Sequence, residues 1–366
     1  MQLQLRRTGE HAYFAASNSR GGFYSYYEHC FRGRVDRLYC IKGGPGTGKS
    51  TLMREIMREG ERRGYRAEAY YCSSDADSLD GVLLFGRTDS IGLLDATSPH
   101  AFEPRVPGAR ENIIDLGRFW NEQALTAEYP RIETLNRQKS DAYRACYRCL
   151  AGVGELSDAL RDAVTPCVDI EKMNRTARRL TKGLGGGEQG DVEIRLRDSL
   201  GLGGRVRLDT YMREAERLCL IEDYHDSAYL LMDQLVANAG GQKASMRISR
   251  HPILPDRTDA MLLTESKTAF VVCETQELSM LTELWPRARV ISMRRMMQKE
   301  SLRAMRDELR RLDRLRAALL DEAISQMSKA SNAHFCLERI YSSAMDFAAK
   351  ERYTAELCRR LFDAEK

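Results

Sequence analysis

A glycine-rich run near the amino-terminal end constrains the fold of this chain more than any other feature. Residues 43–51 read Gly-Gly-Pro-Gly-Thr-Gly-Lys-Ser-Thr, which fits the phosphate-binding pattern of glycine, four residues, then Gly-Lys-Ser/Thr. Such a loop requires a strand before it and a helix after it. The apolar run 37–41 predicts the strand, and apolar residues at helical spacing from Leu52 to Met57 predict the helix. We therefore expect an α/β fold with a parallel sheet.

The residues of this run have the chemistry that a nucleoside triphosphate requires. Glycines let the backbone N–H groups turn inward around phosphates, because they tolerate positive φ and carry no Cβ. We expect Lys49 to reach the β- and γ-phosphates of ATP and the Ser50 hydroxyl to ligate Mg²⁺. A glycine-rich turn without a ligand is the alternative, which the flanking strand and helix disfavour. The predicted site, in a P-loop NTPase-type sheet, comprises Gly43, Gly44, Pro45, Gly46, Thr47, Gly48, Lys49, Ser50 and Thr51.

A carboxylate at the end of a neighbouring strand is the next requirement, because it holds the hydration shell of the Mg²⁺ ion. The apolar run 91–94 ends in Asp95, which makes Asp95 the candidate. An ordinary aspartate at a strand end is the alternative. With this assignment Lys49 and Asp95 are the predicted catalytic pair, and Ser50 and Asp95 are the predicted metal ligands.

An acidic, hydroxyl-rich stretch follows the strand predicted at residues 67–72. Ligands of open α/β sheets bind beyond the carboxyl ends of strands, so Asp75 and Asp77 are candidates for orienting water or acting as a general base. A capping turn before a helix explains these aspartates equally well. His100 is a weaker candidate for contacting the γ-phosphate, and an ordinary loop histidine is the favoured interpretation.

The chain repeats itself at an interval of about 180 residues, too long for a solenoid repeat. We therefore expect two domains of one fold: residues 1–185, with the phosphate-binding loop, and residues 186–366, each with a helical extension. The glycine-rich stretch around residue 185 predicts a flexible linker. The repeat pairs residues 37–41 with 217–221, 52–56 with 231–235, and Gly21-Gly22 with Gly203-Gly204.

The second copy lacks the groups that make a phosphate site. Residues 222–230 contain no glycine and no lysine, and Glu222, Asp223 and Asp226 would repel a triphosphate. The strand predicted at 269–273 ends in cysteine where the first copy has Asp95. We expect this half to be regulatory or structural. Its loop, which includes His225, is expected to be solvated rather than to bind a metal.

Two long tracts, residues 120–180 and 297–364, show helical periodicity without strand signals. They predict either a hairpin within the chain or a contact with a second copy or another protein. The arginines of the second tract are interleaved with acidic residues, and the net charge is only +4, so nucleic acid is disfavoured but not excluded. A heptad-like seam comprises Leu302, Met305, Leu309, Leu312, Leu315 and Leu319.

The composition predicts a cytoplasmic protein without a membrane segment. No run approaches ~18 apolar residues, and the amino-terminal residues lack the apolar stretch of a signal peptide. The ten cysteines have no regular spacing, which fits reduced thiols. Cys146 and Cys149 form a CxxC pair in a predicted helix, where two thiols on a helix face are favoured over a zinc or redox site.

The whole chain resembles a little-characterised family of bacterial P-loop ATPases of similar length, built from two related halves. The resemblance rests on residues 43–51, on residues 72–81, and on Asp95 to His100 followed by Pro107-Gly108. It implies ATP binding and ATP hydrolysis and names no cellular substrate. The second half of that family can also keep a glycine-lysine loop. This chain departs from the family there, so the resemblance does not imply two ATP sites.

Three functions are compatible with these residues. The first is an ATPase whose ATP binding and hydrolysis move the second half or a partner. The second is a kinase that transfers the γ-phosphoryl group to a small molecule, with Asp75 or Asp77 as base. The third is a nucleotide-binding scaffold with negligible turnover. No acceptor pocket is evident in the sequence, so the ATPase is the leading hypothesis.

Overall fold

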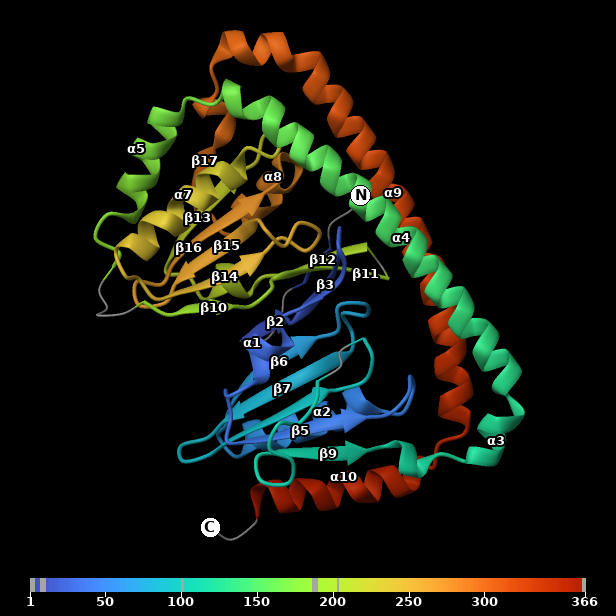
Figure 1. The fold of residues 1–366 in the computed structure, drawn as a ribbon. Coiled ribbons are helices and arrows are strands. Elements are labelled where there is room, and N and C mark those ends of the chain that lie inside the picture. The colour runs from blue at the N-terminus through green and yellow to red at the C-terminus, as the bar shows by residue number, and fades with distance from the viewer. Residues whose placement is uncertain (1–3, 7–10, 100–101, 186–189, 203, 364–366) are drawn as a thin grey trace.

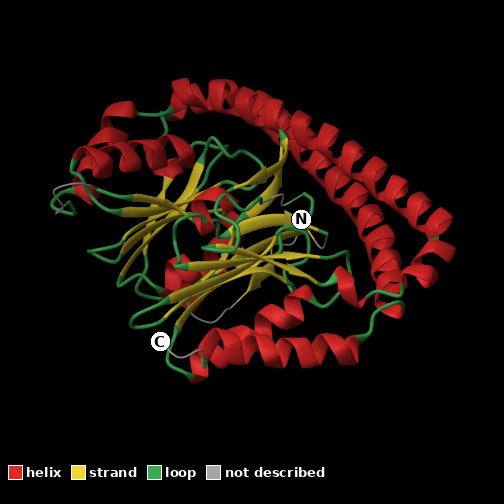
Figure 2. Cartoon of the chain, turned by 60° about the horizontal axis from the view of Figure 1, so that its bottom comes forward, coloured by secondary structure: helices red, strands yellow, loops and turns green. Residues whose placement is uncertain are grey.

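The computed structural model describes residues 4–6, 11–99, 102–185, 190–202 and 204–363. The chain is a mixed α/β protein with two six-stranded sheets, and a pair of long helices runs along one side of both (Figure 1; Figure 2). His100 and residues 186–189 of the expected linker lie outside the described residues. Among the described helices, none is long and apolar enough to cross a membrane.

The first sheet forms around the strand that precedes the glycine-rich loop. Its strand order is β2-β6-β7-β8-β5-β9. The helix α2 (Lys49–Arg62) follows β5 and buries Leu52, Met53 and Ile56 against the sheet. The strands are β2 (Ala12–Phe14), β5 (Arg37–Lys42), β6 (Arg66–Tyr71), β7 (Leu79–Phe85), β8 (Ser90–Asp95) and β9 (Glu111–Asp115).

The expectation of a parallel sheet holds only in part. Strand β5 is parallel to both neighbours, β8 and β9, and β2 is parallel to β6. Strand β7 runs antiparallel to β6 and β8, and the sequence analysis did not predict it. Only a short connection separates β6 from β7, and a parallel pair would need a crossover of a dozen or more residues.

The second sheet repeats this arrangement strand for strand, with the order β10-β14-β15-β16-β13-β17. Here β13 is parallel to β16 and β17, and β15 is antiparallel to both of its neighbours. The helix α7 (Ala228–Gly241) follows β13 as α2 follows β5. The strands are β10 (Val192–Ile194), β13 (Arg217–Glu222), β14 (Met246–Arg250), β15 (Thr258–Leu263), β16 (Thr268–Cys273) and β17 (Arg289–Ser292).

Even an irregularity is shared between the two sheets. The register between β6 and β7 shifts at Tyr70/Tyr71 and leaves Asp80 between two paired residues. The register between β14 and β15 shifts at Ser249/Arg250 and leaves Asp259 in the same position. A β-bulge re-aims a side chain at a sheet edge. Each sheet therefore holds one buried aspartate in this bulge.

Smaller elements join the two sheets. Phe14 of β2 and Leu196 exchange backbone hydrogen bonds of 2.8 and 3.1 Å, and one buried apolar cluster contains residues of both halves. The two sheets thus share a core. These elements are β1 (Gln4–Arg6), β3 (Ala16–Ser19), β4 (Gly22–Ser25), β11 (Asp198–Gly201), β12 (Gly204–Leu208), α1 (Tyr27–Phe31), α3 (Glu122–Ala127), α6 (Thr210–Arg213), α8 (Thr275–Leu284), and the 3₁₀ turns Gly117–Phe119, Thr165–Cys167 and Met293–Met296.

Each of the two helical tracts ends in a helix that packs on the sheet of the other half. Helix α4 (Tyr129–Val164) leads to α5 (Ile170–Thr181), which packs on α7 of the second sheet. Helix α9 (Lys299–Ser343) leads to α10 (Phe347–Phe362), which packs on α2 of the first sheet (Figure 1). The division between residues 185 and 186 therefore separates the sheets, while α5 and α10 each cover the sheet of the other half.

Helices α4 and α9 pair with each other within the chain, which is the hairpin alternative of the sequence analysis (Figure 2). Leu309 and Leu312 of α9 are buried with Leu160 and Val164 of α4. Leu315 departs from the predicted seam, because its side chain is 49% exposed. A straight helix rotates slowly relative to a seven-residue repeat, so a long heptad-like seam does not keep every member on one face.

Candidate functional site

The glycine-rich loop lies at the carboxyl end of β5 and leads into the first turn of α2. Gly46 and Gly48 have φ of 70° and 80°, a backbone region that favours glycine. Gly48 is the residue before α2, and it caps the helix without a side-chain hydrogen bond. The first N–H groups of α2 therefore lack a side-chain acceptor from that residue. A helix N-terminus with unpaired N–H groups attracts anions.

Lys49 turns back from α2 into the loop. Its ammonium donates hydrogen bonds to the carbonyl oxygens of Gly43 and Gly44, at 2.8 and 2.7 Å. The same Nζ lies 3.5 Å from Oδ2 of Asp95, and the Lys49 side chain is only 13% exposed. The loop carbonyls and Asp95 thus hold this cation at the strand ends.

Asp95 ends β8, and its backbone lies opposite Ile41 of β5 in the parallel pair. Its carboxylate accepts a hydrogen bond of 2.9 Å from the N–H of Thr97. Burial raises the pKa of Asp95, the charge of Lys49 opposes that shift, and the nearby Asp80 adds to it. Asp80 was expected only as a substitute for Asp95 and not as a member of the predicted site, because its position beside Asp95 depends on the bulge in β7.

The hydroxyl groups of the loop have defined partners. Oγ of Ser50 accepts a hydrogen bond of 2.9 Å from the N–H of Leu79, the first residue of β7. Thr47 donates to the carbonyl oxygen of Gly44 at 2.9 Å, while Thr51 is exposed. Strand β7 thus fixes Ser50 beside the edge where Asp80 and Asp95 stand.

Asp75 and Asp77 lie in the turn between β6 and β7. The Asp75 carboxylate accepts hydrogen bonds from the N–H of Asp77 at 3.0 Å and from Oγ of Ser78 at 2.7 Å. Asp77 is 82% exposed and forms an ion pair with Arg6. These contacts are those of an aspartate-capped turn, as in the alternative interpretation, but the turn leads into strand β7 and not into the helix which that interpretation expected. In the part of the chain that the structure describes, no hydrogen bond or ion pair joins either carboxylate to Lys49 or Asp95.

The end of α9 covers the glycine-rich loop. Oγ of Ser342 donates a hydrogen bond of 3.1 Å to the carbonyl oxygen of Gly46. A Cβ on Gly46 would lie 2.5 Å from the carbonyl oxygen of Glu338, so glycine is required there for this close approach as well. The sequence analysis missed these contacts, because nothing local in α9 indicates that it touches a loop almost 300 residues earlier.

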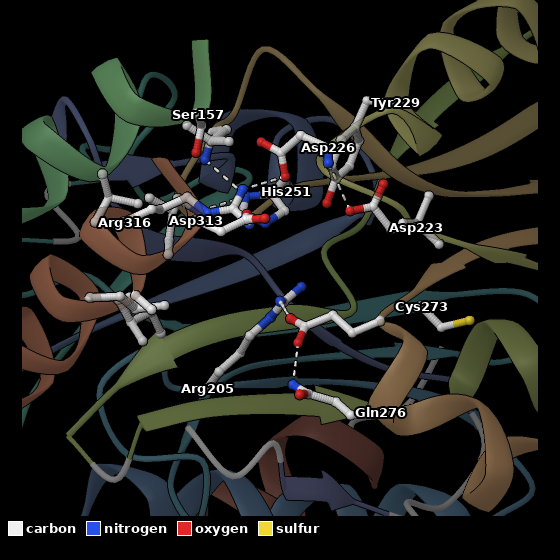
Figure 3. Close-up of a pocket in the computed structure, with 18 of the residues that line it drawn as sticks. Ser157, Arg205, Asp223, Asp226, Tyr229, His251, Cys273, Gln276, Asp313 and Arg316 are labelled. Carbon is white, nitrogen blue, oxygen red and sulfur yellow. Dashed lines mark hydrogen bonds and ion pairs between the residues drawn. The ribbon is translucent and has the colours of Figure 1, made fainter. Parts of the chain in front are cut away.

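In the matching loop of the second half, a carboxylate of the chain itself accepts hydrogen bonds from backbone N–H groups at the start of the helix (Figure 3). The Asp223 carboxylate accepts hydrogen bonds from the N–H of Asp226 at 3.0 Å and from the N–H of Ala228 at 2.9 Å. Ala228 is the first residue of α7, so an internal carboxylate occupies this helix N-terminus. Burial and the neighbouring Asp226 raise the pKa of Asp223 to about 6.

This second loop is half-buried to buried, contrary to the expectation that it is solvated. Asp226 is 5% exposed, and its two oxygens pair with Arg257, at 2.6 Å, and with Arg316 of α9. His225 pairs with Asp313, also on α9. The long helices cover the loop and bring the charges that neutralise it. Within the described residues, no group of three or more His, Cys, Asp or Glu side chains has a metal-binding arrangement.

A cavity of about 430 Å³ lies between this second loop, the ends of β13 and β16, and the helices α4 and α9. Arg205 points into it from β12, opposite Asp313 and Arg316 of α9 (Figure 3). Arg205 also pairs with the buried Asp198 at 2.7 Å and with Glu274 at 3.3 Å. The arginines of this cavity are thus already neutralised by carboxylates of the chain.

The two loops occupy the same place in two sheets of the same order, and they differ in what fills the helix N-terminus. Function is inferred from these residues and their geometry. Comparison with protein-family models, with curated proteins and with solved structures gave no match.

Proposed function

We propose that the chain is an ATPase that binds Mg-ATP at residues 43–51 and hydrolyses it, with the second half in a structural or regulatory role. The observation that carries the proposal is the position of Lys49. Its ammonium lies between the carbonyl oxygens of the loop and the Asp95 carboxylate, at the ends of two adjacent parallel strands. That position suits a cation that compensates the charge of the β- and γ-phosphates.

The rest of the loop has the donors that a triphosphate needs. The N–H groups at the start of α2 would donate to phosphate oxygens, and the helix dipole favours the negative charge. The left-handed conformations of Gly46 and Gly48 let the backbone curve around such a ligand. The fold class, a P-loop NTPase, is part of the same proposal.

The oxygen ligands near the loop fit Mg²⁺. This ion usually retains several waters and takes one or two protein oxygens together with phosphate oxygens. Ser50 and Asp95 would hold it, directly or through water, and the bound ion would supply charge neutralisation at the β- and γ-phosphates. Asp80 adds a second carboxylate to this edge of the sheet. A larger cluster of carboxylates is not required.

The experiment that tests the proposal compares Lys49→Ala with wild type in Mg-ATP binding by calorimetry and in release of inorganic phosphate. Removing the ammonium should lower binding or turnover at least ~10-fold, because phosphate charge is left uncompensated. Lys42→Ala is the matched control, because Lys42 flanks the same loop but its ammonium bonds to Ala96 and Glu103. Unchanged binding and turnover in Lys49→Ala would refute the site. Phosphate release without an added acceptor distinguishes an ATPase from a kinase.

A further inference from the structure

Lys350 is a buried cation at the glycine-rich loop that comes from the other half of the chain. It lies in the first turn of α10, where Asp346 caps the helix by accepting a hydrogen bond of 2.9 Å from the N–H of Ala349. Lys350 is 2% exposed. A Cβ on Gly48 would lie 3.4 Å from Cε and 3.7 Å from Nζ of Lys350. The side chain therefore fills the space in front of the glycine that precedes Lys49.

Among the described residues, the ion pair that this buried side chain forms is a long one. Nζ of Lys350 lies 3.9 Å from Oε1 of Glu55, too far for a hydrogen bond, and the Glu55 side chain is 42% exposed. Taking an ammonium out of water is unfavourable unless a close partner offsets the loss of hydration. For Lys49, by contrast, two carbonyl oxygens and Asp95 provide that offset.

Lys350 approaches Gly48 on the side where any other residue would carry its Cβ. A glycine at such a position lets the backbone come close to a ligand. The N–H groups that begin α2 follow Gly48 directly in the chain, so Gly48 has one lysine next to it in sequence, Lys49, and a second one in contact with it from α10, Lys350. A phosphate group carries the charge that would pair with both.

We propose that Lys350 binds a phosphate oxygen of the nucleotide, so that the second half supplies a ligand-binding residue to the site in the first half. This inference rests on the proposed function. Its consequence is a link between nucleotide occupancy and the carboxyl-terminal helices, because the phosphate would bridge α10 to the start of α2. Ser342 and Glu338 of α9 contact the same loop, so the link extends to the long helix pair.

The test is Lys350→Met, which keeps the length of the apolar stem and removes the charge. We expect Mg-ATP and Mg-ADP to bind at least ~10-fold more weakly, because one charge-assisted hydrogen bond is lost. Without nucleotide, the midpoint of thermal unfolding should stay equal or rise, because a poorly compensated charge is replaced by an apolar group. A purely structural lysine would lower the unfolding midpoint instead.

Glu55→Gln is the control that separates the two roles of Lys350. If Lys350 serves only to pair with Glu55, this variant should reproduce the loss of nucleotide affinity; if Lys350 binds phosphate, affinity should be retained. Normal nucleotide affinity in Lys350→Met would overturn the inference, and so would an equal loss in Glu55→Gln. A loss in Lys49→Ala together with normal binding in Lys350→Met would overturn the role of Lys350 and leave the nucleotide site intact. No binding by the wild type would overturn both.

Discussion

The helices α2 and α7 begin at the same place in two sheets of the same strand order, yet different groups surround their N-termini. In the first half the preceding loop is glycine-rich, and Gly48 offers no side-chain acceptor to the helix. In the second half Asp223 accepts hydrogen bonds from the N–H groups of Asp226 and Ala228. One helix N-terminus has no side-chain acceptor from the residue before it, and the other already has a carboxylate of the chain.

The neutralising charges differ in the same way. Lys49 belongs to its own loop, whereas the second loop depends on Arg257 and on Arg316 of α9 to neutralise Asp226. Helix α9 contacts both loops, through Arg316 at one and Ser342 at the other, about 40 Å apart along the helix. The same strand order is thus compatible with a loop that carries its own cation and with a loop whose carboxylate is neutralised from other elements.

The number of nucleotides bound per chain tests this comparison most directly. Titration calorimetry with a slowly hydrolysed ATP analogue and Mg²⁺ should give one site per chain. The second loop should bind at least ~1000-fold more weakly, a difference of about 4 kcal/mol, because a phosphate would have to displace the Asp223 carboxylate and meet Asp226.

Tyr229→Phe is the control in the second loop, because Tyr229 lines the cavity there and is buried. It should leave the binding event unchanged, while Lys49→Ala weakens it. Two sites in the wild type, with one surviving in Lys49→Ala, would show that the second loop still accepts nucleotide.

Arg257→Met tests whether the second loop is held by its ion pairs. Arg257 is fully buried and bonds to Asp226 at 2.6 Å and to Asp158 at 2.9 Å. Removing one partner of a buried pair should lower the free energy of unfolding by about 3 kcal/mol, measured by denaturant titration. Arg20→Met, which removes a partly exposed contact to the same Asp158, should cost below about 1 kcal/mol. Equal losses in the two variants would contradict the distinction.

Asp95→Asn separates the metal from the nucleotide in the first loop. The change should lower Mg²⁺-dependent phosphate release ~100-fold, about 2.7 kcal/mol in the barrier, because in the proposed site the carboxylate would act through a bound Mg²⁺. Nucleotide affinity should fall less than turnover. Turnover equal to wild type would assign the metal role to another residue, and Asp80 is the first to examine because its charge influences Asp95.

The smallest predicted effect is on the acid stability of the junction between the halves, where Glu214 lies. Burial alone would raise the pKa of Glu214, but hydrogen bonding to His11, the charge of Arg247 and the Tyr13 hydroxyl lower it to about 2. A carboxylate with a depressed pKa stabilises the fold above its unfolded pKa of about 4.3, and the contribution is lost as the pH falls towards 2. We expect a loss of about 2 kcal/mol in unfolding free energy between pH 5 and pH 2 from this group.

Glu214→Gln should remove that part of the acid dependence, measured by denaturant unfolding at a series of pH values. Glu216→Gln is the matched control, because Glu216 pairs with Lys267 at the surface and is 69% exposed. If the wild type and Glu214→Gln lose stability in parallel as the pH falls, the carboxylate does not hold the junction.

Much of the secondary structure was predictable from local patterns. The strands around residues 37–41, 67–72, 91–95, 217–221 and 269–273, and the helices after both loops, lie where the sequence analysis expected them. These elements have strong apolar runs or helical spacing. Strand β7 was missed because Asp80 and Gly81 near its start are typical of loops, and its partner strands lie elsewhere in the chain.

The tertiary structure alone decided which residues surround each loop. Contacts such as Ser342 with Gly46, or Arg316 with Asp226, join residues far apart in sequence, and no local pattern specifies them. The packing of α5 and α10 on the sheet of the other half depends on the path of α4 and α9. Apolar periodicity shows that these helices are amphipathic, but it does not show which surface each one covers.

The sequence by itself determined the α/β class, the repeat and the glycine-rich loop with Lys49. These features depend on residues that are close together in the sequence, which set the backbone conformation and the apolar periodicity. The tertiary structure decided the mixed strand directions, the carboxylate inside the second loop and the approach of Lys350 to Gly48. The physical reason is that these features depend on which surfaces bury each other when the whole chain folds. That choice minimises exposed apolar area and unpaired charge over the entire molecule rather than within any one segment.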